Sequence, residues 1–231
     1  MDAPTPTPNP DTRDSLLDAA LACFAKYGYD ATSIRLIASL AGKNSSLISY
    51  YFKSKEGLYR DVFKHMLARF QGCEPVDPPE TPLADPRERL NHHFRRLLRQ
   101  VEEHLRSKDP LQHQAARLFM AELHGPKDEV KDLILARIAP AVAEIRACLC
   151  ELRPGLTEPE LAFWGITLQG MCMAHSVHSE LNKLVWPNAD HALSLEEMAD
   201  RLTDFACKGL GAPGPIPHDP PPGLPKEPLH A

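Results

Sequence analysis

Apolar residues recur at intervals of three and four along most of this chain, the spacing that places them on one face of an α-helix. Leu17, Ala20, Leu21 and Phe24 are the first clear example. No stretch alternates β-branched and polar residues between turns, as a half-buried strand does. The sequence therefore predicts an all-α fold.

Glycines and capping residues divide roughly the first 70 residues into four short helices. Gly28 is expected to end the first helix and Gly42 the second, because glycine readily adopts the conformation that follows a helix C-terminus. Hydroxyl and amide side chains are positioned to cap the next three helices: Thr32 or Ser33, then Asn44, then Ser54. The second and third of these helices are thus brought close together by a tight turn at Gly42.

Longer helices are expected over the rest of the chain, at 85–106, 110–123, 126–151, 157–184 and 194–210. A proline-rich connection at 71–84 precedes them. Pro140 should kink the third of these helices or divide it in two. Thr157 and Ser194 each stand three residues before a glutamate, which is the pattern of a capping box.

Composition limits the class of protein. The chain has 231 residues, of which 43% are hydrophobic and 25% charged, as in ordinary globular proteins. Its proline-rich ends, 1–10 and 212–231, are predicted to be disordered. With no signal-peptide pattern and no apolar stretch long enough to span a bilayer, we expect a cytoplasmic protein. Its six cysteines lack the dense spacing of a disulfide framework, so we expect reduced thiols.

Charge is distributed unevenly. Residues 12–70 hold nine Lys and Arg against five Asp and Glu, a net charge of +4, whereas the whole chain carries −5. The remainder therefore carries −9. Because counterion release depends on cations at the interface and not on the total charge, a basic N-terminal region can still bind nucleic-acid phosphates.

The segment AGKNSSLISYYFKSKE, at 41–56, admits two interpretations. A nucleotide-binding loop would need a glycine five residues before its Gly-Lys, a preceding strand, and Ser or Thr after the lysine. Ile37 and Asn44 occupy those two positions and no strand precedes them, so this interpretation fails. A helix-turn-helix hinged at Gly42 explains more of the segment, because Ser45, Ser46 and Ser49 keep the second helix slim enough for a major groove.

The stretch AALACFAKYGYDATSIRLIASLAGKNSSLISYYFKSKEGLYRDVF resembles the N-terminal domain of the TetR family of transcriptional regulators. The chain departs from the family pattern at Lys43 and Asn44, where the family usually has Val and Ser. The segment FMAELHGP and the helix after it are similar to a CecR-like subgroup. The exposed serines of the second helix and the family resemblance together imply ten DNA-binding residues. They are Ser33, Arg35, Lys43, Asn44, Ser45, Ser46, Ser49, Tyr50, Tyr51 and Lys55.

The resemblance also implies a homodimer with a three-helix DNA-binding head and a C-terminal helical domain for ligand binding and dimerisation. We expect the head at 11–54, a connecting helix at 55–70 and the regulatory domain at 71–211. Four residues of the last two long helices are candidates for the dimer interface: Phe163, Leu168, Leu202 and Phe205. Candidates for the effector pocket are Phe119, Leu123, Trp164, Met171, Cys172 and His175.

Other polar clusters suggest alternatives. Cys172, His175 and His178 follow one another by threes, but an ideal helix splays the outer pair by about 120°, so we expect packing rather than a metal site. Of His92 and His93, one should face inward. Nearby arginines should form a solvated face, or else meet an anionic effector or a partner subunit: Arg95, Arg96 and Arg99. Cys148 and Cys150 do not form a CxxC redox motif.

The sequence predicts a regulator, not an enzyme, because no catalytic or cofactor-binding motif is found. We expect no cofactor. A repressor released from a palindromic operator by a small-molecule effector is the main hypothesis, with double-stranded DNA, a second copy of the chain and that effector as partners. A ligand-independent architectural or partner-binding helical protein remains the alternative.

Overall fold

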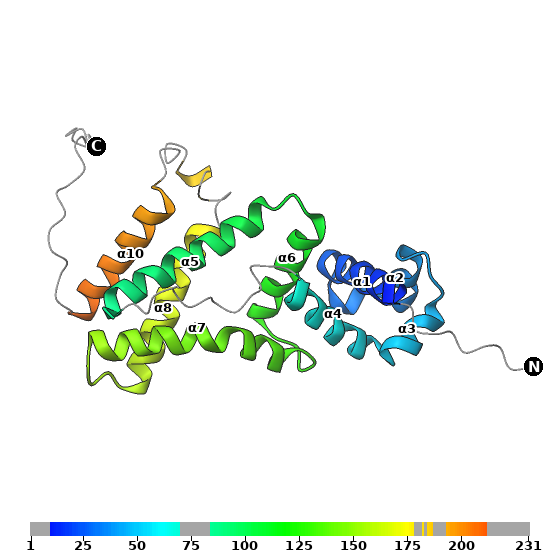
Figure 1. The fold of residues 1–231 in the computed structure, drawn as a ribbon, viewed down its shortest axis with the longest axis horizontal. Coiled ribbons are helices and arrows are strands. Elements are labelled where there is room, and N and C mark those ends of the chain that lie inside the picture. Colours follow the sequence, from blue (N-terminus) through cyan, green and yellow to red (C-terminus); the bar gives the residue numbers. More distant parts are fainter. Residues whose placement is uncertain (1–9, 70–83, 178–181, 183, 187–192, 212–231) are drawn as a thin grey trace, which may run out of the picture.

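The computed structural model describes residues 10–69, 84–177, 182, 184–186 and 193–211, and every long element among them is a helix (Figure 1). The head consists of α1 (Pro10–Ala31), α2 (Ile34–Leu40) and α3 (Ser45–Phe52), and α4 (Lys55–Arg69) leads out of it. The body consists of α5 (Pro86–Arg106), α6 (Pro110–His124), α7 (Lys131–Leu152), α8 (Glu158–Val177) and α10 (Leu195–Leu210). The all-α prediction is confirmed.

Caps and glycines shape the head as the sequence predicts. Ser33 and Asn44 are the N-caps of α2 and α3, and Ser54 Oγ accepts the Gly57 N–H at 3.1 Å at the start of α4. Gly28 interrupts α1 with a φ of 79°. Gly42, with a φ of 62°, supplies the turn between α2 and α3.

The joint between α3 and α4 depends on a glycine for a different reason. A Cβ atom at Gly57 would overlap the carbonyl oxygen of Phe52, the last residue of α3. The backbones of the two helices therefore meet more closely than any side chain at this position would allow.

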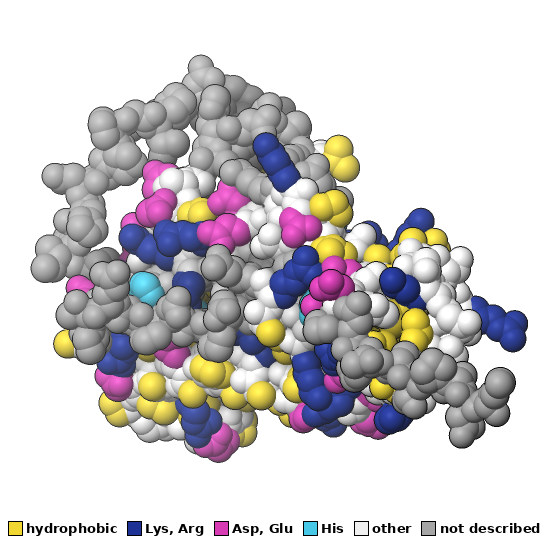
Figure 2. Space-filling view, turned by 45° about the vertical axis from the view of Figure 1, so that its right-hand side comes forward, with side chains coloured by type: hydrophobic (Ala, Val, Ile, Leu, Met, Phe, Trp, Pro, Cys, Tyr) yellow, Lys and Arg dark blue, Asp and Glu magenta, His cyan; other side chains and the backbone are white. Residues whose placement is uncertain are grey.

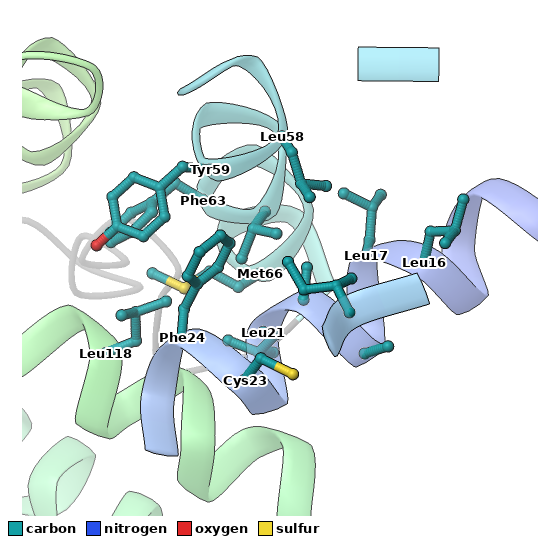
Figure 3. Close-up of a cluster of buried hydrophobic side chains, with 14 of the residues drawn as sticks. Leu16, Leu17, Leu21, Cys23, Phe24, Leu58, Tyr59, Phe63, Met66 and Leu118 are labelled. Atoms are coloured by element: carbon teal, nitrogen blue, oxygen red, sulfur yellow. The ribbon is translucent and has the colours of Figure 1, made fainter. Parts of the chain in front are cut away.

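The head and part of the body share one hydrophobic core, here called the head cluster. It joins buried residues of α1 to α4 to Ala115 and Leu118 of α6 and to Val130 and Ile134 at the start of α7. Figure 3 shows Leu118 of α6 beside Phe24, Phe63 and Met66. The head is therefore not closed by its own helices alone.

A second core, the body cluster, lies at the other end of the molecule between α5, α7, α8 and α10. Its members are Leu90, Phe94, Leu98, Ile145, Cys148, Leu149, Leu161, Leu168, Cys172, Ala199, Leu202, Ala206 and Leu210. Since α7 contributes its first turn to the head cluster and its last turns to the body cluster, this one helix connects the two cores.

Most helix bounds agree with the sequence prediction, but α7 differs in two respects. It begins at Lys131 instead of 126, after a turn in which the Val130 N–H donates to the Lys127 carbonyl oxygen at 3.0 Å. It also continues through Pro140 without dividing, with buried residues anchoring it on both sides, Ile134 before the proline and Ile145 after it. Residues 71–83 of the predicted connection, 1–9 and 212–231 of the predicted tails, and most of 178–184 lie outside the described residues, whereas Pro10, predicted to be disordered, begins α1.

Of the two predicted capping boxes, one forms completely. At Ser194 the hydroxyl accepts the Glu197 N–H at 3.2 Å, and the Glu197 carboxylate accepts the Ser194 N–H at 2.8 Å. At Thr157 only the carboxylate half forms, because the Thr157 hydroxyl donates to Glu160 Oε2 at 2.7 Å instead of accepting a backbone N–H.

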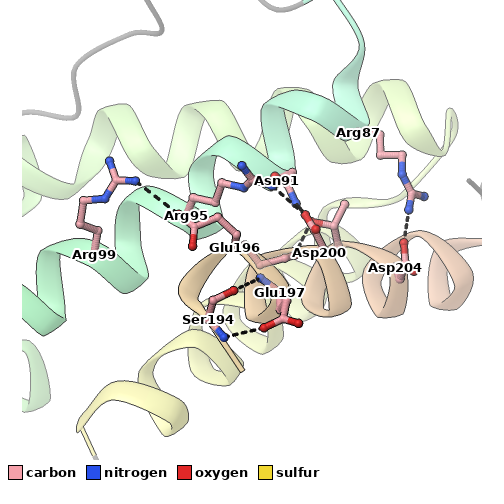
Figure 4. Close-up of polar contacts among 11 residues, drawn as sticks. Arg87, Asn91, Arg95, Arg99, Ser194, Glu196, Glu197, Asp200 and Asp204 are labelled. Carbon is pink, nitrogen blue, oxygen red and sulfur yellow. Dashed lines mark hydrogen bonds and ion pairs between the residues drawn. The ribbon is translucent and has the colours of Figure 1, made fainter. Parts of the chain in front are cut away.

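The predicted solvated arginine face of α5 is confirmed in part: Arg95 and Arg99 are 39% and 58% exposed, but all three side chains also pair within the chain (Figure 4). Arg95 lies 3.0 Å from Asp200, and Arg99 lies 3.9 Å from Glu196, both on α10. Arg96 instead turns toward α7. The sequence could not predict the pairs of Arg95 and Arg99, because their partners are about a hundred residues away.

Among the described residues, no helix combines the length and hydropathy needed to cross a membrane.

Candidate nucleic-acid interface

Helix α3 packs one face on the head and leaves the other open (Figure 1). Ile48 and Phe52 are buried in the head cluster, whereas Ser46 and Ser49 are exposed. Asn44 Oδ1 accepts the Ser46 N–H at 2.9 Å and so fixes the start of the helix. The exposed face consists of small hydroxyl side chains, which suits a helix that has to enter a major groove.

An open hollow lies between α2 and α3 and brings several predicted DNA-binding residues together. Arg35 and Lys43 supply exposed cations, and basic side chains project from the outer end of the head in Figure 2. The hollow is lined by Arg35, Ala38, Ser39, Lys43, Asn44 and Ser45. Cations and hydroxyls in such an arrangement are the groups that contact phosphate oxygens.

Lys55 begins α4 and is held against the end of α1. Its Nζ lies 4.3 Å from the centroid of the Tyr29 ring and 3.4 Å from the Asp30 carbonyl oxygen. The ammonium is therefore kept beside the N-terminus of a helix, where an anion is favoured by both groups.

Some of the predicted DNA-binding residues also stabilise the head. Ser33 Oγ accepts the Leu36 N–H at 3.1 Å. Tyr51 is partly buried and packs against the head cluster, while its ring centroid lies 5.0 Å from that of Tyr50. Replacing Ser33 or Tyr51 would thus disturb the fold as well as any DNA contact.

Lys53 is a basic residue of this surface that the sequence did not assign to DNA. It is exposed at the end of α3, and it is the one non-glycine residue of the described chain with a positive φ, 69°. Its ψ of −49° and the 2.8 Å hydrogen bond from the Ser54 N–H to the Phe52 carbonyl oxygen make this a γ-turn centred on Lys53, a strained conformation. The signal that could have found it is its place in Lys53-Ser54-Lys55, between the end of α3 and the cap of α4.

Polar contacts join the head to the body behind this surface. The buried Tyr59 hydroxyl donates to Glu122 Oε1 at 2.6 Å, and Glu122 Oε2 accepts the Lys127 N–H at 2.7 Å. Burial, followed by this hydrogen bond, raises the pKa of Tyr59 far above its usual range. Arg60 donates to both carboxylate oxygens of Asp132 and lowers the pKa of Asp132 to about 2.

The residues predicted for an effector pocket do not come together in one place. Phe119 packs against the head cluster, whereas Trp164 and Met171 pack against the body cluster, to which Cys172 belongs. Leu123 and His175 are exposed. The described residues therefore place these six side chains around two separate cores.

A buried polar group in the body was only partly foreseen. As predicted for one of the two histidines, His93 faces inward and is 2% exposed, with Nδ1 3.3 Å from Glu144 Oε2. Arg96 donates to the same oxygen at 2.9 Å. Burial alone would raise the pKa of Glu144, but these hydrogen bonds outweigh it and lower the pKa to about 2.

The four residues predicted for the dimer interface divide into two pairs. Leu168 and Leu202 are 0% and 6% exposed, so they fill the core of their own chain. Phe163 and Phe205 are 61% and 57% exposed, on α8 and α10. Helical spacing alone could not separate these pairs, because it does not show which side of a helix meets its own chain.

Cys172 and His175 are the two described members of the cysteine and histidine series of α8, and they differ in exposure. Cys172 is buried, and burial raises the pKa of its thiol to about 12, whereas His175 is exposed. His178 lies outside the described residues. Within the described ranges, no group of three or more His, Cys, Asp or Glu is arranged to hold a metal ion.

Comparison with known proteins identifies the head. Residues 16–62 match the family model described as bacterial regulatory proteins, tetR family. The transcriptional repressor NicS of Pseudomonas putida is 40% identical over 79 residues, 34% of this chain and 36% of NicS. The dual regulator CecR of Shigella flexneri is 53% identical over 47 residues, 20% of this chain and 21% of CecR.

The matched part of the chain thus spans about a third of the length of NicS and a fifth of that of CecR. The CecR match covers 47 residues, and the CecR-like subgroup stays a prediction. Among solved structures, AibR in complex with isovaleryl coenzyme A and operator DNA is 17% identical, with a TM-score of 0.52 over 84% of this chain and 97% of that chain. That similarity extends the agreement in fold into the body. The match to the tetR family of bacterial regulatory proteins is therefore shown for residues 16–62.

Proposed function

We propose that the chain is a sequence-specific DNA-binding transcriptional regulator that acts as a homodimer. The observation that carries the proposal is α3, which is buried on its Ile48 and Phe52 side and presents exposed serines on the other. A helix so presented can reach base edges, while the cations beside it contact phosphates. The proposed DNA-binding residues are the ten that the sequence predicts, with Lys53 added.

The domain division remains part of the proposal. We infer a DNA-binding head at 11–54, a connecting helix at 55–70 and a regulatory and dimerisation domain at 71–211. Two heads about one helical turn apart, roughly 34–36 Å, would bind the two halves of a palindromic operator. Because the exposed Phe163 and Phe205 lie on neighbouring helices of the body, they are the interface residues that we retain.

Repression relieved by a small molecule is the form of regulation that we favour. NicS is named a repressor, and AibR was solved with both isovaleryl coenzyme A and operator DNA, which supports effector-dependent DNA binding on a similar fold. The effector has to bind the two head spacings unequally, because otherwise it shifts no equilibrium. An operator-binding protein of a bacterium works in the cytoplasm, and we place this one there.

A mobility-shift assay on the promoter of the chain's own gene tests the proposal. Tyr50→Ala and Lys55→Ala should each weaken retardation by at least about tenfold, since one removes a possible base contact and the other a phosphate contact. Ala162→Ser, an exposed change on α8, is the control and should retard DNA like the parent. Equal retardation by parent and both head variants would reject direct DNA contact by this surface and favour the architectural alternative.

A further inference from the structure

One corner of the head is shared by a lysine of the head and a lysine of the body. Lys55 Nζ lies 4.3 Å from the centroid of the Tyr29 ring, and Lys127 Nζ lies 5.1 Å from the same centroid. Lys127 belongs to the turn between α6 and α7, 98 residues from Tyr29 in sequence and in the part of the chain that we assign to the regulatory domain. No sequence feature pointed to this meeting.

The backbone of Lys127 is fixed in place by a buried carboxylate. Glu122, 5% exposed, accepts the Lys127 N–H on one oxygen at 2.7 Å and the Tyr59 hydroxyl on the other at 2.6 Å. Since Tyr59 packs on Tyr29 with ring centroids 4.7 Å apart, the ring beneath both lysines is held by the same network. The lysine side chain therefore starts from a rigid base.

The ammonium of Lys127 is nevertheless available to a partner. Its side chain is 32% exposed, and the carboxylate of Asp30 beside it is 4.0 Å away and 92% exposed. An ion pair at that distance on an open surface contributes little and is easily exchanged for a stronger one. Glu56 and Glu129 also lie near Tyr29 and raise its pKa, after the larger effect of burial.

We propose that Lys127 is a DNA-backbone contact supplied by the body, held with Lys55 on Tyr29 to meet phosphates beside the N-terminus of α4. The inference rests on the proposed function, because it assigns a further binding residue to the same DNA interface. It extends that interface from the head to the turn between α6 and α7. A shift of this turn would therefore act on DNA affinity directly, as well as through the position of α4.

The salt dependence of DNA binding distinguishes a phosphate contact from a structural role. The logarithm of the binding constant falls with the logarithm of the salt concentration, with a slope of about −0.9 for each phosphate neutralised. For the full-length protein on a duplex of its own promoter, Lys127→Gln should make the slope less steep by about 0.9 per subunit, as Lys55→Gln should. Lys127→Arg, which keeps the charge, should restore the parent slope.

Lys208→Gln on α10 is the matched control, since it removes one exposed lysine at the far end of the body. Its slope should equal that of the parent. The inference is overturned if Lys127→Gln leaves the slope unchanged, whatever it does to affinity, or if Lys208→Gln changes the slope equally. If the parent itself shows no salt-dependent DNA binding, the proposed function fails; if only Lys55→Gln changes the slope, the inference alone fails.

A second pair of variants tests whether the Tyr29 ring positions Lys55 and Lys127. Tyr29→Phe keeps the aromatic face under both ammonium groups and should preserve the parent slope. Tyr29→Leu removes that face and should make the slope less steep, provided that circular dichroism shows a folded protein. A Tyr29→Leu slope equal to that of the parent would show that the ring does not position the two lysines.

Discussion

The head cluster and the body cluster differ in their aromatic residues: the head cluster buries Phe24, Phe52, Tyr59 and Phe63, whereas Phe94 is the one aromatic residue among the buried members of the body cluster. In the head cluster Phe24, Tyr59 and Phe63 are among the most completely buried side chains of the described chain, and they pack edge to face. Two other aromatic residues of the body, Phe163 and Phe205, are exposed on its surface. The first core is complete within one chain, whereas the second has an apolar side that a partner subunit could cover.

Polar groups do not follow this division, because both regions have polar links on the surface and inside. The charged residues between α5 and α10 pair across the outside of the body cluster, as Figure 4 shows for Arg87 with Asp204 and for Arg95 with Asp200. Buried polar links occur in both regions: Tyr59 donates to Glu122, and His93 and Arg96 meet Glu144 in the body. Apolar contacts within the head cluster should therefore determine the stability of the monomer, while the exposed body face should determine assembly.

The largest expected effect is on the head cluster. Phe24→Ala should lower the free energy of unfolding by about 3–5 kcal/mol, because it opens a cavity beneath Tyr29 and Tyr59. Urea unfolding followed by circular dichroism measures the loss. Phe205→Ala, which removes a similar but exposed ring, is the control and should change the stability of the dilute monomer by less than about 0.5 kcal/mol. Similar losses in both variants would contradict the comparison.

Dimerisation, unlike the stability of the monomer, should depend on the exposed rings of the body. Replacing both Phe163 and Phe205 by Ser should weaken dimerisation by about 2–4 kcal/mol, since buried aromatic anchors carry much of the energy of an interface. Analytical ultracentrifugation over a range of concentrations would show the shift toward monomer, and Tyr27→Ser, which removes a 48%-exposed ring on the head, should not cause it. A double variant that dimerises like the parent would show that this face is not the interface.

An acid titration sharpens the comparison for charged groups. Glu144 has a folded-state pKa of about 2 against an ordinary value of 4.5, so the stability it contributes is present above pH 4.5 and is lost as pH falls toward 2. Glu144→Gln should remove about 2 kcal/mol of this acid-dependent stability. Asp132→Asn should remove much less, because solvent screens that exposed pair. Thermal unfolding at pH 2.5, 4 and 6 tests both; equal losses would contradict the role of burial.

The smallest expected effect concerns Asp30. Asp30→Asn removes the exposed carboxylate beside Lys127, so it should tighten promoter binding by a few-fold at low salt, corresponding to less than about 1 kcal/mol. Fluorescence anisotropy at two salt concentrations measures the change. Asp14→Asn, which also removes an exposed acid of α1, should have a smaller effect. If Asp30→Asn weakened binding, the carboxylate would have to be assigned a structural role.

Much of the fold could be predicted because its signals are local. Gly28, Gly42, Asn44 and Ser194 act on residues within one turn of themselves, and all four behave as expected. The exposed serine face of α3 follows from the same local periodicity.

The rest depends on which distant residues meet. Leu168 and Phe163 carry the same apolar signal, but one faces its own chain and the other faces away from it. The pairing of Arg95 with Asp200, and the meeting of Lys127 with Tyr29, join residues about a hundred positions apart. Periodicity shows that a helix has an apolar side, but the packing of the helices decides what covers that side.

The missing side chain of Gly57 has a consequence for how a new binding preference could arise. At this joint the backbone of Gly57 meets the backbone of Phe52. The angle between α3 and α4 is therefore set by main-chain atoms and not by any side chain that would contact a nucleotide. Substitutions along the serine face could then change which bases are preferred while the helix still approaches the duplex along the same line. A substitution at Gly57 would instead change the angle between α3 and α4, and so would move every DNA contact of α3 together.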